Sequence, residues 1–139
     1  KALKIYFIII ILIIKESKLD TTKTLEMIQL AFKNKKFNLA NEKILQKNIS
    51  LAFDEKNISY KKEVRLDNQN IVDFMIDSLA IEIKIKTKLS TLSIYRQLER
   101  YCTNDKVKAI LLITSKNISI PNMINGKEVY VLPLSRTQL

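Results

Sequence analysis

The stretch Ile71–Lys86, IVDFMIDSLAIEIKIK, predicts two β-strands joined by a tight turn. Apolar and polar residues alternate on both sides of the turn, and a period of two sends successive side chains to opposite faces of a strand. Val72, Phe74 and Ile76 are therefore expected to share one face of the first strand. Isoleucines at alternate positions of the second strand can be buried on that face, so this hairpin is the centre of the predicted fold.

The register of the hairpin decides which polar side chains meet. A two-residue turn after Ile76 would pair Ile76 with Leu79, and counting back places Asp73 opposite Glu82, with β-carbons ~4.5–5.5 Å apart. Two carboxylates that close repel each other unless a proton or a cation lies between them. Lys84 follows on the same face. An Asp, a Glu and a Lys around one point are the groups of a divalent-metal site that hydrolyses phosphodiesters.

Composition narrows the classes of function. The chain has 139 residues, enough for one domain (1–139) with a substantial core. Its formal net charge of +10 favours a polyanionic partner, either nucleic acid or an anionic membrane surface, although a Lys-rich surface can also simply be solvated. The absence of His excludes Ser-His-Asp triads, and the single glycine, Gly126, excludes glycine-rich phosphate loops.

The single cysteine, Cys102, cannot form an intrachain disulfide or a multi-cysteine zinc site, and it fits a reducing, cytoplasmic compartment. Acid–base chemistry must then come from Asp, Glu, Lys or Tyr. Such hard oxygen ligands favour Mg²⁺ or Mn²⁺ over zinc.

The N-terminal stretch Ile5–Ile14, IYFIIIILII, consists of ten apolar residues between Lys4 and Lys15. It is shorter than the ~20 residues of a spanning helix, and no small-residue cleavage site of a signal peptide follows it. Its β-branched composition predicts a buried strand or one paired across an oligomer interface. We therefore expect a homodimer contact here as one option and regard a membrane partner as the weaker one.

Three helices are predicted around the hairpin. Asp20 or Thr21 can cap a short helix that runs to about residue 33, and Asn38 or Asn41 can cap a longer helix to about residue 55. A third helix is expected over Leu89–Thr103. Glu42 near the start of the second helix either complements the helix dipole or belongs to an active site.

The remaining strands complete a mixed α+β sheet. Ile58–Leu66 alternates as a strand and joins the hairpin in a three-stranded antiparallel meander. Val107–Thr114 has the length and residue types of a buried parallel strand. After a turn at Asn125–Gly126, Glu128–Leu134 is predicted as an edge strand because it contains Pro133.

Four pieces of this sequence, in this order and on these elements, resemble the PD-(D/E)xK nuclease superfamily, with the Gln-x-x-x-Tyr spacing of its RecB-like branch: Glu42 on a helix, Asp73, Glu82-Ile83-Lys84, and Gln97 with Tyr101. The resemblance covers residues 36–134 and implies an α/β, restriction-endonuclease-like core of helix, antiparallel meander, helix and strands. Residues 1–35 lie outside that core. Val72 stands where the family carries a proline before the aspartate.

The resemblance implies a Mg²⁺-dependent (or Mn²⁺-dependent) deoxyribonuclease and a role for each matching residue. Asp73 and Glu82 would hold the cation together with the Ile83 carbonyl, and Glu42 would ligate it through water or bind a second ion. Lys84 would position or help deprotonate the attacking water.

Gln97 and Tyr101 would buttress the site or contact DNA, although their spacing alone suits a helix packing face equally well. Four basic residues around the site would bind the phosphate backbone: Lys86, Lys88, Arg96 and Arg100. Each of them, considered alone, can also be an ordinary charged residue in contact with solvent.

The expected function is a DNA nuclease of repair or of a mobile element. It would be directed by nucleic-acid structure or strand ends, because no recognition helix for a long sequence is evident. Two alternatives stay open. One is a dimeric endonuclease similar to Holliday-junction resolvases, and the other is a basic nucleic-acid-binding module without catalysis.

Overall fold

The computed structural model describes residues 2–85 and 88–134, except for the side chains of residues 17–19. The helices of this part of the chain are α1 (Ala2–Phe32), α2 (Glu42–Glu55) and α3 (Thr91–Cys102). Its strands are β1 (Lys61–Arg65), β2 (Ile71–Ile76), β3 (Leu79–Lys84), β4 (Ala109–Thr114), β5 (Met123–Ile124) and β6 (Lys127–Pro133).

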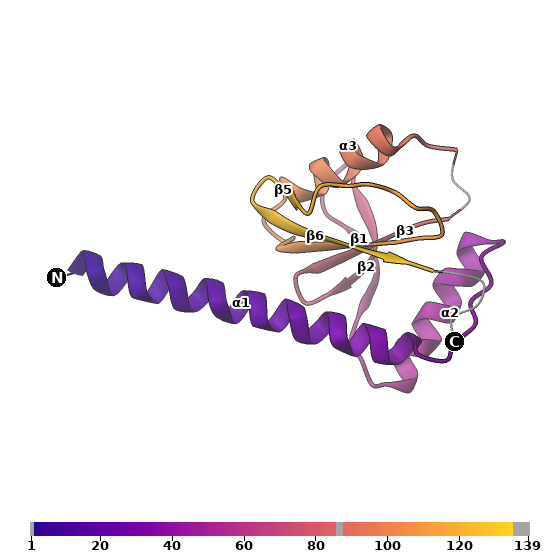
Figure 1. The fold of residues 1–139 in the computed structure, drawn as a ribbon, viewed down its shortest axis with the longest axis horizontal. Helices are drawn as coiled ribbons and strands as arrows, with labels where there is room; N and C mark the ends of the chain where they lie inside the picture. The colour runs from indigo at the N-terminus through magenta and orange to yellow at the C-terminus, as the bar shows by residue number, and fades with distance from the viewer. Residues whose placement is uncertain (1, 86–87, 135–139) are drawn as a thin grey trace.

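The strands form one mixed sheet in the order β1-β2-β3-β4-β6-β5, which confirms the predicted mixture of strands and helices. β1, β2 and β3 are antiparallel neighbours, so the predicted meander is present. β3, β4 and β6 are parallel. In Figure 1, α1 and α2 lie along one face of the sheet and α3 along the other.

Each face of the sheet carries its own apolar core. On one side, Phe53 of α2 and Phe32 of α1 pack on Phe74 and the isoleucines of β3. On the other side, Ile94 and Leu98 of α3 pack on residues from β2, β4 and β6. The sheet is therefore buried between two layers of helices, and the strands in its middle are apolar on both faces as parallel strands usually are.

The predicted register of the central hairpin is confirmed. Ile76 pairs with Leu79, and Phe74 pairs with Ile81. The turn residue Asp77 adopts a left-handed φ of 51°, which Asp tolerates better than most residues because of its short polar side chain. The hairpin therefore closes as predicted without a glycine.

The second helix begins as the sequence indicates. Of the two candidate caps, Asn41 occupies the N-cap position, and its side chain accepts hydrogen bonds from the backbone N–H groups of Lys43 and Ile44. Glu42 consequently lies in the first turn, where a negative charge is favoured by the helix dipole.

The prediction of a strand at Ile5–Ile14 is wrong, and so is a helix start at Asp20 or Thr21. α1 is one continuous helix from Ala2 to Phe32. No glycine or proline interrupts this stretch, and no described strand lies beside it to accept backbone hydrogen bonds. The buried C-terminal turns around Ile28 and Phe32 anchor the helix, and helix propagation from an existing turn is far easier than nucleation.

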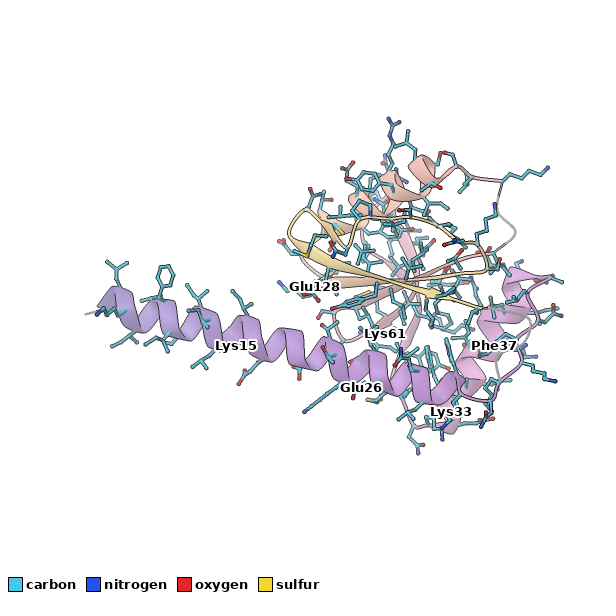
Figure 2. All side chains as sticks on the ribbon, in the orientation of Figure 1. Lys15, Glu26, Lys33, Phe37, Lys61 and Glu128 are labelled. Carbon is cyan, nitrogen blue, oxygen red and sulfur yellow. The ribbon has the colours of Figure 1, made fainter. Side chains whose placement is uncertain are left out.

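The N-terminal half of α1 extends away from the rest of the fold (Figure 1). Its apolar side chains are exposed on every side, from 45 % at Ile11 to 79 % at Leu3. Figure 2 shows side chains standing off both sides of the helix before Lys15. None of the described helices is long and apolar enough to cross a membrane.

The placement of the last strand at an edge is also wrong, because β6 lies between β4 and β5. β5 pairs only with the start of β6, where Met123 faces Glu128 and Ile124 faces Lys127 across the predicted Asn-Gly turn. Pro133 lies beyond these pairs. Its missing N–H therefore breaks no pair with β5.

Candidate active site

The structure brings Asp73, Glu82 and Lys84 together at the middle of the meander. The paired residues of β2 and β3 end at Phe74 and Ile81, and Asp73 and Glu82 are the next residues of the two strands. The Lys84 ammonium lies 3.0 Å from Glu82 Oε1. Asp73 Oδ2 accepts the backbone N–H of Ile83 at 2.7 Å, so the aspartate reaches across to the strand that carries the other two groups.

The strand backbone is irregular around Asp73. The residue that faces Asp73 in the β1–β2 register is Glu63, which has a left-handed φ of 49°. Val72 packs in the core under α3, whereas Phe74 packs in the core under α1 and α2. The prediction that Val72 shares a face with Phe74 is therefore wrong, because the two side chains pack in different cores and the alternation along β2 is broken at Asp73.

The backbone of β3 adds an oxygen to the same place. The N–H and the carbonyl of one strand residue leave the strand on the same side. Since the Ile83 N–H points at the Asp73 carboxylate, the Ile83 carbonyl also leaves β3 on the side of β2. This is the orientation that its predicted role as a ligand requires.

Burial makes the two carboxylates hard to ionise together. Burial raises the pKa of Asp73 to about 6, with smaller additions from the charges of Glu42 and Glu63, against the stabilising effects of the Ile83 N–H and Lys84. Burial also raises the pKa of Glu82 to about 7, and the Asp73 charge adds to it. Lys84 supplies one positive charge beside these two carboxylates, so a further cation would be needed to balance both of them when they are ionised.

One oxygen of this pair lacks any hydrogen-bond partner among the described residues. Glu82 is 4 % exposed, and its Oε1 is paired with Lys84, but its Oε2 is buried and unsatisfied. A buried carboxylate oxygen without a donor is strongly unfavourable, which makes it a natural place for a cation.

The residues present fit a magnesium ion with a small protein ligand set. No group of three or more Asp, Glu, His or Cys side chains in the described part of the chain is close enough to hold a metal. Mg²⁺ commonly uses only one or two carboxylates and keeps several waters. Asp73, Glu82 and the Ile83 carbonyl would supply such a set. Glu42 is half-buried in the first turn of α2 and acts on Asp73 through its charge.

Gln97 and Tyr101 of α3 contact β2 and β3 from the face of the sheet that α3 covers. The Gln97 amide donates to the Tyr101 hydroxyl at 2.7 Å and lies 3.4 Å from Glu82 Oε1. The Tyr101 hydroxyl in turn donates to the Ile71 carbonyl at 3.1 Å. Tyr101 is 1 % exposed, and burial followed by the charge of Glu82 raises its pKa above the usual value. These contacts connect α3 to Glu82 and to the backbone of β2.

The basic residues differ in their surroundings. Lys88 and Arg96 are exposed, while Lys86 lies outside the described residues. Arg100 is exposed too, but its guanidinium donates to Asn70 Oδ1 at 3.3 Å and therefore holds the turn between β1 and β2.

Sequence reasoning missed Gln46. Its side-chain amide donates to Asp73 Oδ1 at 3.1 Å from α2, across 27 positions of the chain. The available signal was its spacing, because a residue four positions after Glu42 lies on the same side of a helix.

No protein-family model, no curated protein and no solved structure matched this chain.

Proposed function

We propose that this protein is a metal-dependent nuclease of the PD-(D/E)xK type, with a restriction-endonuclease-like core, that hydrolyses DNA phosphodiester bonds. The observation that carries the proposal is the buried, unpartnered Oε2 of Glu82 beside Asp73 and Lys84. Two carboxylates and an ammonium at one point have little structural use, since apolar residues of similar size would cost the fold less.

Asp73, Glu82 and the Ile83 carbonyl would hold Mg²⁺ or Mn²⁺, with Glu42 contributing through water. When bound, this cation would neutralise charge on the phosphate and make a water molecule easier to deprotonate.

Lys84 is the group that would act on the water and the phosphate. Its side chain is mostly buried, with 15 % of its surface exposed. The ion pair with Glu82 Oε1 fixes its position at 3.0 Å. From there the ammonium orients the attacking water and offsets the negative charge that develops on the phosphate oxygens.

Gln97 and Tyr101 would keep Glu82 and the β2 backbone in place from the α3 side. The substrate class follows from the net charge of +10, which favours a polyanion. Exposed Lys88 and Arg96 would bind phosphates, and cleavage would follow nucleic-acid structure or strand ends. We propose no role for sequence reading.

The test is cleavage of labelled linear, circular, branched and single-stranded DNA with Mg²⁺ or Mn²⁺. Asp73→Asn and Lys84→Met should abolish cleavage and leave DNA affinity nearly unchanged. Asp77→Asn in the exposed hairpin turn is the matched control, since it removes one carboxylate away from the site and should cut normally. DNA binding without cleavage of any substrate would instead favour the non-catalytic basic module.

A second candidate, a dimeric endonuclease similar to junction resolvases, is favoured by the apolar half of α1. Eleven exposed apolar side chains lie between Leu3 and Ile14. A second copy of this chain is the occupant we propose, because a contiguous apolar surface that is exposed to water favours self-association.

Light scattering after size exclusion tests this candidate. Wild type should be dimeric or larger at micromolar concentration, and Ile8→Glu with Ile11→Glu should shift it toward monomer. A monomeric wild type refutes the candidate, and flotation with anionic vesicles would assign the surface to lipid instead.

A further inference from the structure

The carboxylate of Asp73 is held by donors from two different elements. The Ile83 N–H of β3 donates to Oδ2 at 2.7 Å, and the Gln46 amide of α2 donates to Oδ1 at 3.1 Å. The terminal torsion of an aspartate is broad, so one donor leaves the carboxylate free to rotate. Two donors on the two oxygens fix its plane.

The local structure of α2 aims Gln46 at the sheet. Its neighbours Leu45 and Ile49 are both 0 % exposed and anchor the helix against the core, which leaves Gln46 half-buried at the margin. Its amide is a neutral donor. It can therefore orient Asp73 without cancelling the negative charge that a cation needs, whereas a lysine at this position would cancel it.

We propose that Gln46 is a positioning residue that sets the orientation in which Asp73 meets the divalent cation. The inference rests on the proposed function, since it takes a cation at Asp73 and Glu82. Groups that hold a metal ligand in place typically contribute 10–100-fold to metal affinity. Gln46 acts through Asp73 and needs no contact with cation or DNA.

Calorimetric titration with Mn²⁺ alone tests the role of Gln46. The variant Gln46→Met keeps the length of the side chain and removes the donor, and its Mn²⁺ affinity should fall by about 10–100-fold. Asn48→Met is the matched control, because Asn48 is also a half-buried amide of α2 but lies about 200° around the helix from Gln46. Its affinity should stay within twofold of wild type.

Two further measurements separate positioning from folding. Thermal unfolding without metal should change no more in Gln46→Met than in Asn48→Met. With a DNA that wild type cuts, kcat at limiting Mn²⁺ should fall in Gln46→Met while KM for the DNA stays the same. If Gln46→Met does not fold, Gln46→Ala replaces it, since alanine has the highest helix propensity.

Equal Mn²⁺ affinity of folded Gln46→Met and wild type would overturn the role of Gln46 and leave the proposed nuclease intact. A metal-free unfolding midpoint that falls much further than that of Asn48→Met would also overturn it, because the amide would then be structural. A wild type that binds no Mn²⁺ would overturn both proposals.

Discussion

The substitution Glu82→Gln should stabilise the metal-free protein at alkaline pH while it abolishes metal binding. Glu82 is 4 % exposed, its Oε2 has no partner in the described structure, and its pKa is raised from 4.5 to about 7 by burial and then by the charge of Asp73. A carboxyl with a raised folded-state pKa binds more protons when folded than when unfolded. Stability is therefore lost as the pH rises from about 4.5 to about 7.

The size of the effect follows from the shift of the pKa. Each pKa unit corresponds to about 1.4 kcal/mol, so the ionised Glu82 side chain costs the folded state about 3 kcal/mol at pH 8. Glutamine has nearly the same shape and carries no charge. The variant should unfold roughly 10 °C higher than wild type at pH 8, and at about the same temperature at pH 4.5, where Glu82 is protonated in wild type.

Differential scanning fluorimetry at pH 4.5, 6, 7 and 8, without and with Mn²⁺, measures both parts of this prediction. Mn²⁺ at about 100 times its dissociation constant should stabilise wild type by about 2.7 kcal/mol and leave Glu82→Gln unchanged. Glu26→Gln, on the exposed side of α1, is the control and should follow wild type at every pH. A Glu82→Gln variant less stable than wild type at pH 8 without metal would refute the reasoning, because the carboxylate would then be satisfied in the native fold.

Three further predictions test the elements that hold the site. Glu63→Gly should be more stable than Glu63→Ala by about 1 kcal/mol in urea unfolding, because φ is 49° at this position. A more stable alanine variant would contradict the left-handed conformation of Glu63. Tyr101→Phe should cost about 1–2 kcal/mol in the same assay, because the Ile71 carbonyl and the Gln97 amide both lose a partner, and an unchanged midpoint would contradict these bonds. Asn41→Ala should cost about 1 kcal/mol through loss of the N-cap, whereas Asn38→Ala should cost less.

Local sequence patterns alone determined the hairpin and its register. A two-residue turn at Asp77 and Ser78 is enough to set the pairs Ile76–Leu79 and Phe74–Ile81, which bring Asp73 and Glu82 to neighbouring positions. The helix cap and the last turn could also be predicted from the sequence, because Asn41 and the Asn125–Gly126 pair act on backbone atoms only a few residues away. In such cases the chain neighbours set the geometry, so tertiary contacts have little to change.

Long-range packing decided the features that the patterns missed. Ile5–Ile14 has strand-like residues but became helix, because no strand lies beside it among the described residues and α1 is anchored at Ile28. Val72 lies on the opposite face of the sheet from Phe74, a break in the alternation that the sequence of β2 does not indicate. The short strand β5 pairs with β6, so β6 lies inside the sheet. The alternation of residues in β6 gives no indication of this pairing.

The candidate site shows the same division. Sequence spacing identified Asp73, Glu82 and Lys84 because all three lie on one hairpin, whose two-residue turn sets the pairing of the strands. Gln46 contacts Asp73 only because α2 packs against the sheet from 27 positions away. The unsatisfied oxygen of Glu82 is likewise a product of burial, which depends on every layer around it. The sequence therefore determined which charged groups lie close together. Only the tertiary structure decided how deeply they are buried and which residues hold them in place.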